Sequence, residues 1–159
     1  DERFFERTVR ATFEQTYDQV SVVRYAKRKR TKIRGYLNSI KAMPADCIFL
    51  ADINAEPCVT AKKQKLQESY GIEGDRVIVV VMEIESWYLA GLGDEASAEL
   101  GVPVLKDTDS LTKEGFNSLI PQRFDSRIDF TVEILKRFCT GMAKGKNGSF
   151  RYFAERYGL

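Results

Sequence analysis

The sequence contains no histidine among its 159 residues, and this absence limits the chemistry that the chain can perform. Without imidazole there is no Ser-His-Asp or Cys-His triad and no histidine ligand for zinc. The three cysteines, Cys47, Cys58 and Cys139, stand too far apart for a disulfide framework or a C-x-x-C metal knuckle. We therefore expect buried thiols, and we expect any bound metal to be held by oxygen ligands.

Long apolar runs are absent as well. The longest, Val77–Met82, is far shorter than the ~18 residues that cross a bilayer. The beginning of the chain lacks the apolar core and small-residue cleavage site of a signal peptide, so we expect a cytoplasmic protein with no membrane partner. The net charge is only +2, and it creates no global field that attracts nucleic acid.

The spacing of apolar and turn-forming residues predicts an α/β fold with a parallel sheet flanked by helices. Predicted helices span 2–13, 31–43 and 57–70, and predicted strands span 20–23, 47–51 and 77–82. The last helix begins near Pro57 and is closed by Gly71, and it joins two apolar strands as in a right-handed βαβ unit.

After these strands the pattern is helical throughout. Predicted helices or helical pieces span 86–92, 94–100, 112–119, 126–138 and 148–157. We therefore predict an α/β core over residues 1–92 and a C-terminal helical extension over 93–159, packed on the core without a linker.

Four polar side chains follow the two strands of the predicted βαβ unit. Asp52 and Asn54 come after the first strand, and Glu83 and Glu85 come after the second. Ligands bind outside the carboxyl ends of parallel strands, so we expect these side chains to converge on one point. Mg²⁺ or Mn²⁺ is the natural occupant of such an oxygen site. Turn formation by Asp52 and Asn54, and helix-start positions for the glutamates, are the structural alternatives.

A basic run precedes this cluster. It places seven cations in eleven residues, namely Arg24, Lys27, Arg28, Lys29, Arg30, Lys32 and Arg34. The run either contacts a phosphate backbone or forms a solvated face. We interpret Lys62, Lys63 and Lys65 as the exposed face of their helix, and Trp87 with Tyr88 as core residues.

These residues together resemble the Toprim fold of topoisomerases, primases and OLD-type nucleases. Asp52-Ile53-Asn54 after an apolar strand is similar to that family's Asp-x-Asp metal motif. The segments Glu83–Ala90 and Asn147–Phe153 resemble Toprim-related proteins that have a Glu-small-Trp motif and are associated with defence against mobile DNA. In the family a first-strand glutamate completes the metal site, and we expect that strand to lie upstream of Asp1.

The resemblance implies a metal-dependent protein that processes DNA or RNA, a nuclease acting on phosphodiester bonds. Asp52 and Glu85 would be the principal ligands, with Asn54 and Glu83 in support, and Lys113 would neutralise phosphate charge. Arg24, Arg28, Arg30, Lys32 and Arg34 would contact nucleic acid. A homo-oligomer or an ATPase partner is compatible with this assignment. A non-catalytic Toprim-related binding or assembly module is the alternative, and a receiver-type phosphotransfer domain with Asp52 as phosphoacceptor ranks last.

Overall fold

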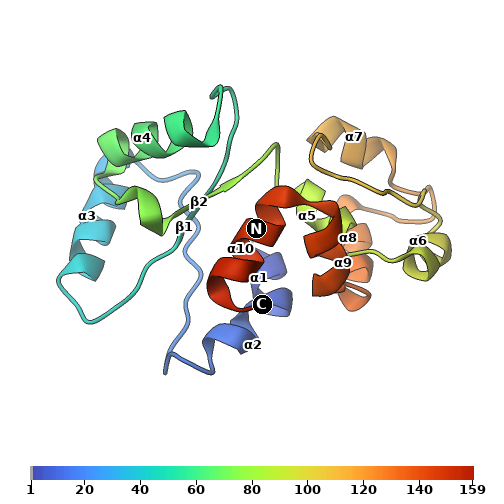
Figure 1. The fold of residues 1–159 in the computed structure, drawn as a ribbon, viewed down its shortest axis with the longest axis horizontal. Helices are drawn as coiled ribbons and strands as arrows, with labels where there is room; N and C mark the ends of the chain where they lie inside the picture. Colours follow the sequence, from blue (N-terminus) through green and yellow to red (C-terminus); the bar gives the residue numbers. More distant parts are fainter. Residues whose placement is uncertain (1) are drawn as a thin grey trace. The chain divides into compact units, whose positions relative to one another are not determined.

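The computed structural model describes residues 2–159, which form two compact units (Figure 1). Unit 2 is the continuous segment Val23–Val81, and unit 1 comprises the chain up to Val22 together with Met82–Leu159. The structure is mixed α/β, with a parallel two-stranded sheet and surrounding helices, which confirms the predicted class in its coarse form. The predicted domains 1–92 and 93–159 stay a prediction.

Unit 2 contains the predicted βαβ arrangement. Strands β1 (Phe49–Asp52) and β2 (Val77–Val80) pair in parallel, with Phe49 opposite Val77 and Asp52 opposite Val80. Helix α4 (Val59–Tyr70) connects them and ends at Gly71, whose φ of 70° is the left-handed conformation that glycine adopts without steric cost. A short 3₁₀ turn, η1 (Gly74–Arg76), leads into β2.

The core of unit 2 lies between its sheet and two helices, α3 (Arg30–Lys41) and α4, which lie side by side in Figure 1. Ile33 and Leu37 form the apolar stripe of α3 at helical spacing. The core consists of Ile33, Leu37, Phe49, Ala51, Leu66, Ile72, Val77 and Val79. Tyr25 packs at its edge, with its ring centroid 4.5 Å from that of Phe49.

The predicted strand Val20–Val23 is wrong. Although three of the four residues are β-branched, they have no regular secondary structure, and the boundary between the two units falls between Val22 and Val23. The Val20 carbonyl accepts a hydrogen bond of 2.7 Å from the Arg10 guanidinium. The Arg10 side chain therefore supplies the hydrogen bond that a neighbouring strand would otherwise donate to the Val20 carbonyl.

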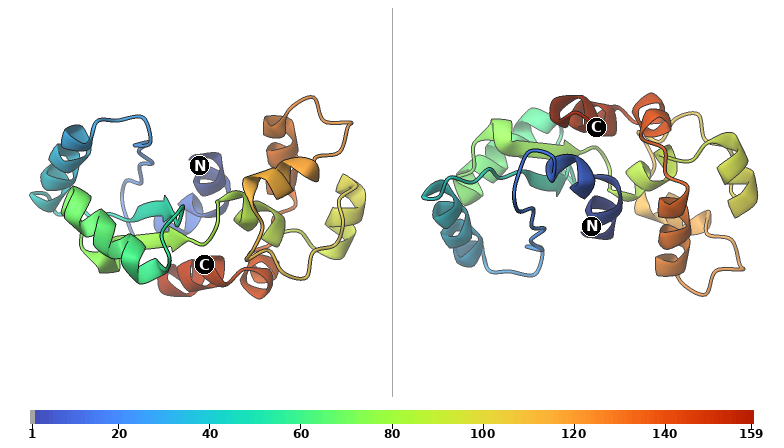
Figure 2. Two further views of the ribbon diagram at one scale, coloured as in Figure 1. Left: turned by 90° about the horizontal axis from the view of Figure 1, so that it is seen from above. Right: turned by 90° about the horizontal axis from the view of Figure 1, so that it is seen from below.

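Unit 1 is helical. Its helices are α1 (Glu2–Thr8), α2 (Arg10–Phe13), α5 (Glu85–Ala90), α6 (Asp94–Leu100), α7 (Lys113–Ser118), α8 (Arg127–Lys136), α9 (Thr140–Lys146) and α10 (Gly148–Tyr157). Figure 2 gives two further views of them. The helices predicted in this part of the chain are present, although the one predicted over 2–13 is divided at Val9 into α1 and α2. Helix α9 is an additional helix that the sequence pattern did not indicate.

Aromatic rings fill the core of unit 1. Phe4, Trp87, Phe150 and Phe153 are each at most 1% exposed, and the Trp87 and Phe153 rings stack with centroids 5.3 Å apart. Trp87 and Tyr88 are thus core residues, as predicted. Within residues 2–159, no helix combines the length and the apolarity needed to cross a bilayer.

Candidate functional site

The carboxyl end of β1 places Asp52 and Asn54 in one short loop. Asp52 is half-buried, and the following Ile53 N–H donates to the Val80 carbonyl at 2.9 Å, which continues the pairing with β2. Asn54 has a φ of 52°, a left-handed conformation that asparagine tolerates well. Its side-chain amide donates to the Asp52 carbonyl at 3.2 Å. Asn54 therefore shapes the turn, as the structural alternative held, and its side chain stays beside Asp52.

Lys62 lies at the same end of unit 2 and is buried. It is only 8% exposed and shares the core face of α4 with Leu66, one turn further along. Our interpretation of Lys62 as an exposed residue is therefore wrong. Burial lowers the pKa of its ammonium group, Lys65 acts in the same direction, and the negative charges of Glu56 and Asp52 act against both. The sequence indicated that this residue is buried, because Lys62 stands four residues before the apolar Leu66 and therefore lies on the same face of the helix.

The start of α4 is organised by Cys58 and Glu56. The Cys58 thiol is the helix cap and accepts from the Ala61 N–H at 3.4 Å. Glu56 forms an ion pair with Lys65 across the first turns of the helix. Cys58 is exposed, as is Cys139, and Cys47 is partly buried, so the expectation of buried thiols is wrong for the two exposed cysteines.

Glu85 occupies the first position of α5 in unit 1 and is engaged in an ion pair. It is 6% exposed, and its carboxylate pairs with the guanidinium of Arg127 on α8. The Arg127 guanidinium also lies 5.6 Å from the centroid of the Phe116 ring. This arrangement agrees with the helix-start alternative. The role of Glu85 as a principal metal ligand stays a prediction.

Glu83 differs from Glu85 in its surroundings. Among the described residues, its Oε2 atom is buried without a hydrogen-bond partner. A buried carboxylate oxygen without a partner is costly, and an ion or a water molecule is the usual reason that such an oxygen is retained.

The segments Glu83–Ala90 and Asn147–Phe153, which carry the family resemblance, meet in one buried hydrogen-bond network in unit 1. The Trp87 indole N–H donates to Ser149 Oγ at 2.8 Å, and Ser149 Oγ donates to Asn147 Oδ1 at 2.8 Å. The Asn147 amide donates to Ser86 Oγ at 3.3 Å and to Thr108 Oγ1 at 3.1 Å. These motif residues therefore hold α5 to the beginning of α10, a role that sequence reasoning missed.

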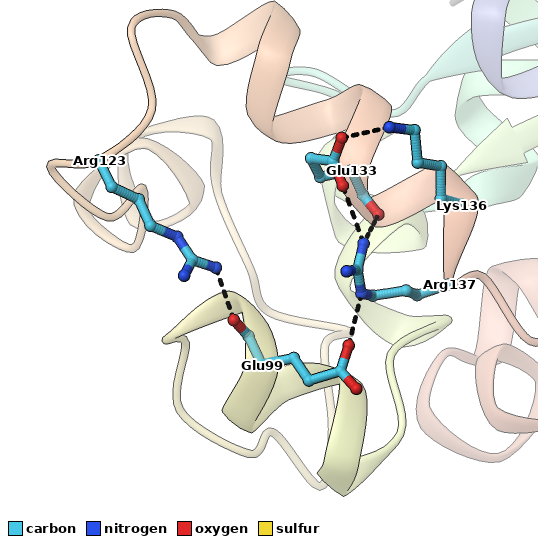
Figure 3. Close-up of polar contacts among 5 residues, drawn as sticks. All are labelled: Glu99, Arg123, Glu133, Lys136 and Arg137. Carbon is cyan, nitrogen blue, oxygen red and sulfur yellow. Dashed lines mark hydrogen bonds and ion pairs between the residues drawn. The ribbon is translucent and has the colours of Figure 1, made fainter.

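A second polar cluster fixes the end of α8, the helix that presents Arg127 (Figure 3). Arg137 donates to Glu99 at 2.8 Å and to the Glu133 carboxylate at 2.9 Å, and Lys136 donates to Glu133 at 2.5 Å. Arg123 donates to the Glu99 carbonyl at 2.6 Å. The hydrogen bonds from Lys136 and Arg137 lower the pKa of Glu133. Because these groups are exposed or partly exposed, the cluster is a scaffold rather than a reactive site.

Lys113 is the first residue of α7 in unit 1 and is exposed. Its side chain makes no hydrogen bond or ion pair with any of the described residues. Its predicted role in neutralising phosphate charge stays a prediction.

Two members of the basic run, Arg28 and Arg30, hydrogen-bond to backbone carbonyls. All five residues predicted to bind nucleic acid, Arg24, Arg28, Arg30, Lys32 and Arg34, are exposed. Arg30 donates to the Ser69 and Glu68 carbonyls at 2.6 and 3.0 Å, which binds the beginning of α3 to the end of α4. Arg28 donates to the Arg24 carbonyl at 2.9 Å. Lys32 and Arg34 make no polar contact within the described part of the chain.

The structure brings Asp52 and Asn54 together in unit 2 and places Glu83 and Glu85 near the start of α5 in unit 1. Over the residues described, neither unit contains a group of three or more cysteine, aspartate or glutamate side chains arranged to hold a metal ion. Comparisons of the chain with protein-family models, with curated proteins and with solved structures find no match. The functional argument therefore depends on the residues themselves.

Proposed function

We propose that the chain is a Toprim-like protein that processes nucleic acid with a divalent metal ion and hydrolyses phosphodiester bonds. The observation that supports this most directly is the loop after β1, where Asp52 and Asn54 lie beside each other at the carboxyl end of a parallel βαβ unit. Ligand sites occur at this end of parallel sheets.

The available donors fit Mg²⁺ or Mn²⁺. Asp52 and Asn54 offer side-chain oxygen atoms in the loop after β1 of unit 2. Hard divalent cations prefer such ligands. A metal bound by these residues would activate water and neutralise charge on the leaving oxygen. The exposed cations Lys32 and Arg34 supply a surface for the phosphate backbone.

Two observations favour the alternative, a non-catalytic Toprim-related module that binds or assembles. A neutral amide stands at position 54 where the family has a second aspartate, and Glu85 is engaged by Arg127. Both features reduce the negative charge available to a cation.

A gain-of-charge substitution separates the two proposals. In Asn54→Asp a second carboxylate joins Asp52, and aspartate also tolerates the left-handed backbone at this position. We expect Mn²⁺ to raise the thermal midpoint of this variant more than that of the wild type. We expect Asp52→Asn to abolish the Mn²⁺ response. A nuclease assay with single- and double-stranded DNA and RNA is run on the same three proteins.

Metal-dependent cleavage by the wild type that is lost in Asp52→Asn supports the enzyme. If the wild type binds nucleic acid, cleaves none of the substrates and shows no Mn²⁺ response, the non-catalytic module is correct. The absence of both binding and cleavage would remove both proposals.

A further inference from the structure

We propose that one flank of α3, formed by Lys29, Lys32 and Tyr36, binds single-stranded nucleic acid, with the two ammonium groups on phosphates and the Tyr36 ring stacked on a base. This inference rests on the proposed function and names its substrate class, a single strand rather than a duplex. Lys29 and Tyr36 are not among the five residues that the sequence predicts to bind nucleic acid.

The two flanks of α3 differ in what they contact. Arg30 and Lys41 donate hydrogen bonds to backbone carbonyls at the end of α4, Arg30 at 2.6 and 3.0 Å and Lys41 at 2.8 Å. That flank is therefore fixed within unit 2. Lys29, Lys32 and Tyr36 follow one another at intervals of three and four residues, so they share the flank on the far side of the buried apolar stripe. All three are exposed.

The charge of this flank is not balanced within its own segment. Residues 19–45 contain no aspartate or glutamate, and the Lys29 and Lys32 side chains form no hydrogen bond or ion pair with any described residue. Lys29 is the N-cap of α3 and Lys32 lies in its first turn, which contains no acidic residue. The helix dipole disfavours cations at that end. An anionic partner would offset this unfavourable placement.

Tyr36 indicates which anion fits. Its side chain is 46% exposed, and with the described residues its ring makes no aromatic contact and its hydroxyl no hydrogen bond. The other tyrosines of unit 2, Tyr25 and Tyr70, pack against Phe49. An exposed ring one turn from an ammonium group suits a single strand, because its unpaired bases offer faces for stacking beside the phosphates. In a duplex the bases stack on one another.

A lipid surface fits α3 less well. Helices that lie on a membrane bury a broad apolar face in it. Ile33 and Leu37 are already buried in the core of unit 2, and Tyr36 is the only exposed large hydrophobic side chain among the twelve residues of α3. The flank is therefore cationic with one aromatic ring, as in proteins that bind single strands.

The test compares Lys32→Ala, Tyr36→Ala and Tyr36→Phe with two control variants in the full chain. Tyr152→Ala removes a tyrosine of similar exposure, 47%, from α10 of unit 1, and Lys106→Ala removes an exposed lysine from unit 1. The probes are a fluorescein-labelled oligothymidylate and a labelled duplex of the same length. Anisotropy measures binding over a range of salt concentrations, in EDTA so that no metal-dependent cleavage occurs.

We expect the wild type to prefer the oligothymidylate to the duplex. Tyr36→Ala should weaken binding of the oligothymidylate about 10-fold or more, as for the loss of one stacked base, without changing the slope of log K against log salt. Lys32→Ala should reduce that slope by about 0.7, the value for one phosphate contact on a single strand. Tyr36→Phe keeps the ring and should bind as the wild type does, as should both control variants.

A tryptophan at the same position gives a second measurement that does not require the alanine variant to fold. Tyr36→Trp places an exposed indole on the flank, while the native Trp87 is fully buried in unit 1. Stacking on a base should quench the fluorescence of the new indole when the oligothymidylate binds. No change in its fluorescence on binding would contradict the stacking role.

The inference is overturned if the wild type binds no nucleic acid or binds the duplex as tightly as the single strand. Wild-type affinity in Tyr36→Ala, or an equal loss in Tyr152→Ala, would also overturn it. Displacement of the oligothymidylate by polyglutamate, or by vesicles containing phosphatidylserine, at the same concentration of negative charge would assign the flank to an acidic protein or to a membrane instead.

The proposed function fails separately. If Lys32 and Tyr36 are needed for binding but Mn²⁺ supports no cleavage, the single-strand surface is correct and the nuclease is wrong. If Lys32→Ala and Tyr36→Ala bind and cleave a single strand as the wild type does, the nuclease is correct and the assignment of the α3 flank is wrong.

Discussion

In unit 1 the buried side chains of Asn147, Ser149 and Ser86 are joined by hydrogen bonds, whereas in unit 2 the strand-end residue Asp52 is half-buried and Asn54 is exposed. Asn147 alone makes hydrogen bonds with Ser86, Thr108 and Ser149, and its oxygen also accepts from the Phe150 N–H at 2.9 Å. Satisfied networks of this kind specify a packed core.

The difference shows how to separate motif residues that maintain a fold from those that are available to a ligand. Glu85, Ser86 and Trp87 belong to a family-like motif, yet each has a partner within unit 1. Asp52 and Asn54 lie at the carboxyl end of β1, where ligands bind in parallel α/β folds. Unit 2 is therefore where substitutions should alter binding, and unit 1 is where they should alter stability.

The largest expected effect is that of Asn147→Ala. The substitution removes the cap of α10 and leaves the hydroxyl groups of Ser86 and Thr108 without their donor. We expect the free energy of unfolding to fall by about 2–4 kcal/mol, measured by urea denaturation. Asn117→Ala, at an exposed position of α7, is the control and should lie within about 0.5 kcal/mol of the wild type. An equal loss in both variants would contradict the network.

Next comes Arg127→Met, which leaves the Glu85 carboxylate buried without its cation. The arginine side chain is 34% exposed, so we expect a loss of about 2–3 kcal/mol, at or below the low end of the range for fully buried pairs. The double variant with Glu85→Gln should recover part of this loss in a thermodynamic cycle. If Arg127→Met is neutral in metal-free buffer, Glu85 does not depend on Arg127, and its predicted role as a metal ligand gains weight.

Glycine substitutions compare the packing of the two units. A Cβ on Gly91 in unit 1 would lie 2.1 Å from a ring carbon of Phe138, whereas a Cβ on Gly35 in α3 would meet nothing within 4 Å. We expect Gly91→Ala to destabilise the protein by about 1–3 kcal/mol. Gly35→Ala should stabilise it by about 0.5–1 kcal/mol, because alanine favours a helix interior. Thermal unfolding measures both, and the same sign for the two would contradict the packing described.

The smallest expected effect on stability at neutral pH is that of the ionisation of two buried tyrosines, Tyr25 and Tyr88. Burial raises the pKa of Tyr25 in unit 2 and of Tyr88 in unit 1, each to about 12. Because these values exceed the unfolded value of about 10, both groups contribute stability that is complete below pH 10 and lost as the pH rises towards 12. Ultraviolet absorbance of tyrosinate should show two late-titrating groups, and Tyr25→Phe should remove one. A full titration near pH 10 in the folded chain would contradict this assignment.

Much of unit 2 could be predicted because its local signals agree. The run Val77–Val80 is apolar at every position, as expected for a strand covered on both faces, and Gly71 marks the end of α4. The position of Asp52 at the end of β1 followed from the same pattern. These features depend on a few neighbouring residues.

The errors arose where distant residues decide the structure. Val20–Val23 has strand-forming residues, but no strand pairs with it, and Arg10 binds its carbonyl. Helix α9 contains Gly141 and Gly145, which lower helix propensity, and packing against α5 and α10 stabilises it. The partner of Glu85 stands 42 residues away at Arg127, a pairing that no local pattern indicates.

Trp87 is the single tryptophan of the chain, and its indole ring is fully buried in unit 1 against Phe153. Its fluorescence therefore reports on one unit alone, whereas the tyrosines Tyr25, Tyr36 and Tyr70 belong to the other. Thermal unfolding can therefore be followed by two signals. Indole fluorescence reports on unit 1, and circular dichroism reports on the whole chain. Coincident melting curves would mean that the two units unfold as one cooperative system, and separated curves would mean that each is a folding unit of its own.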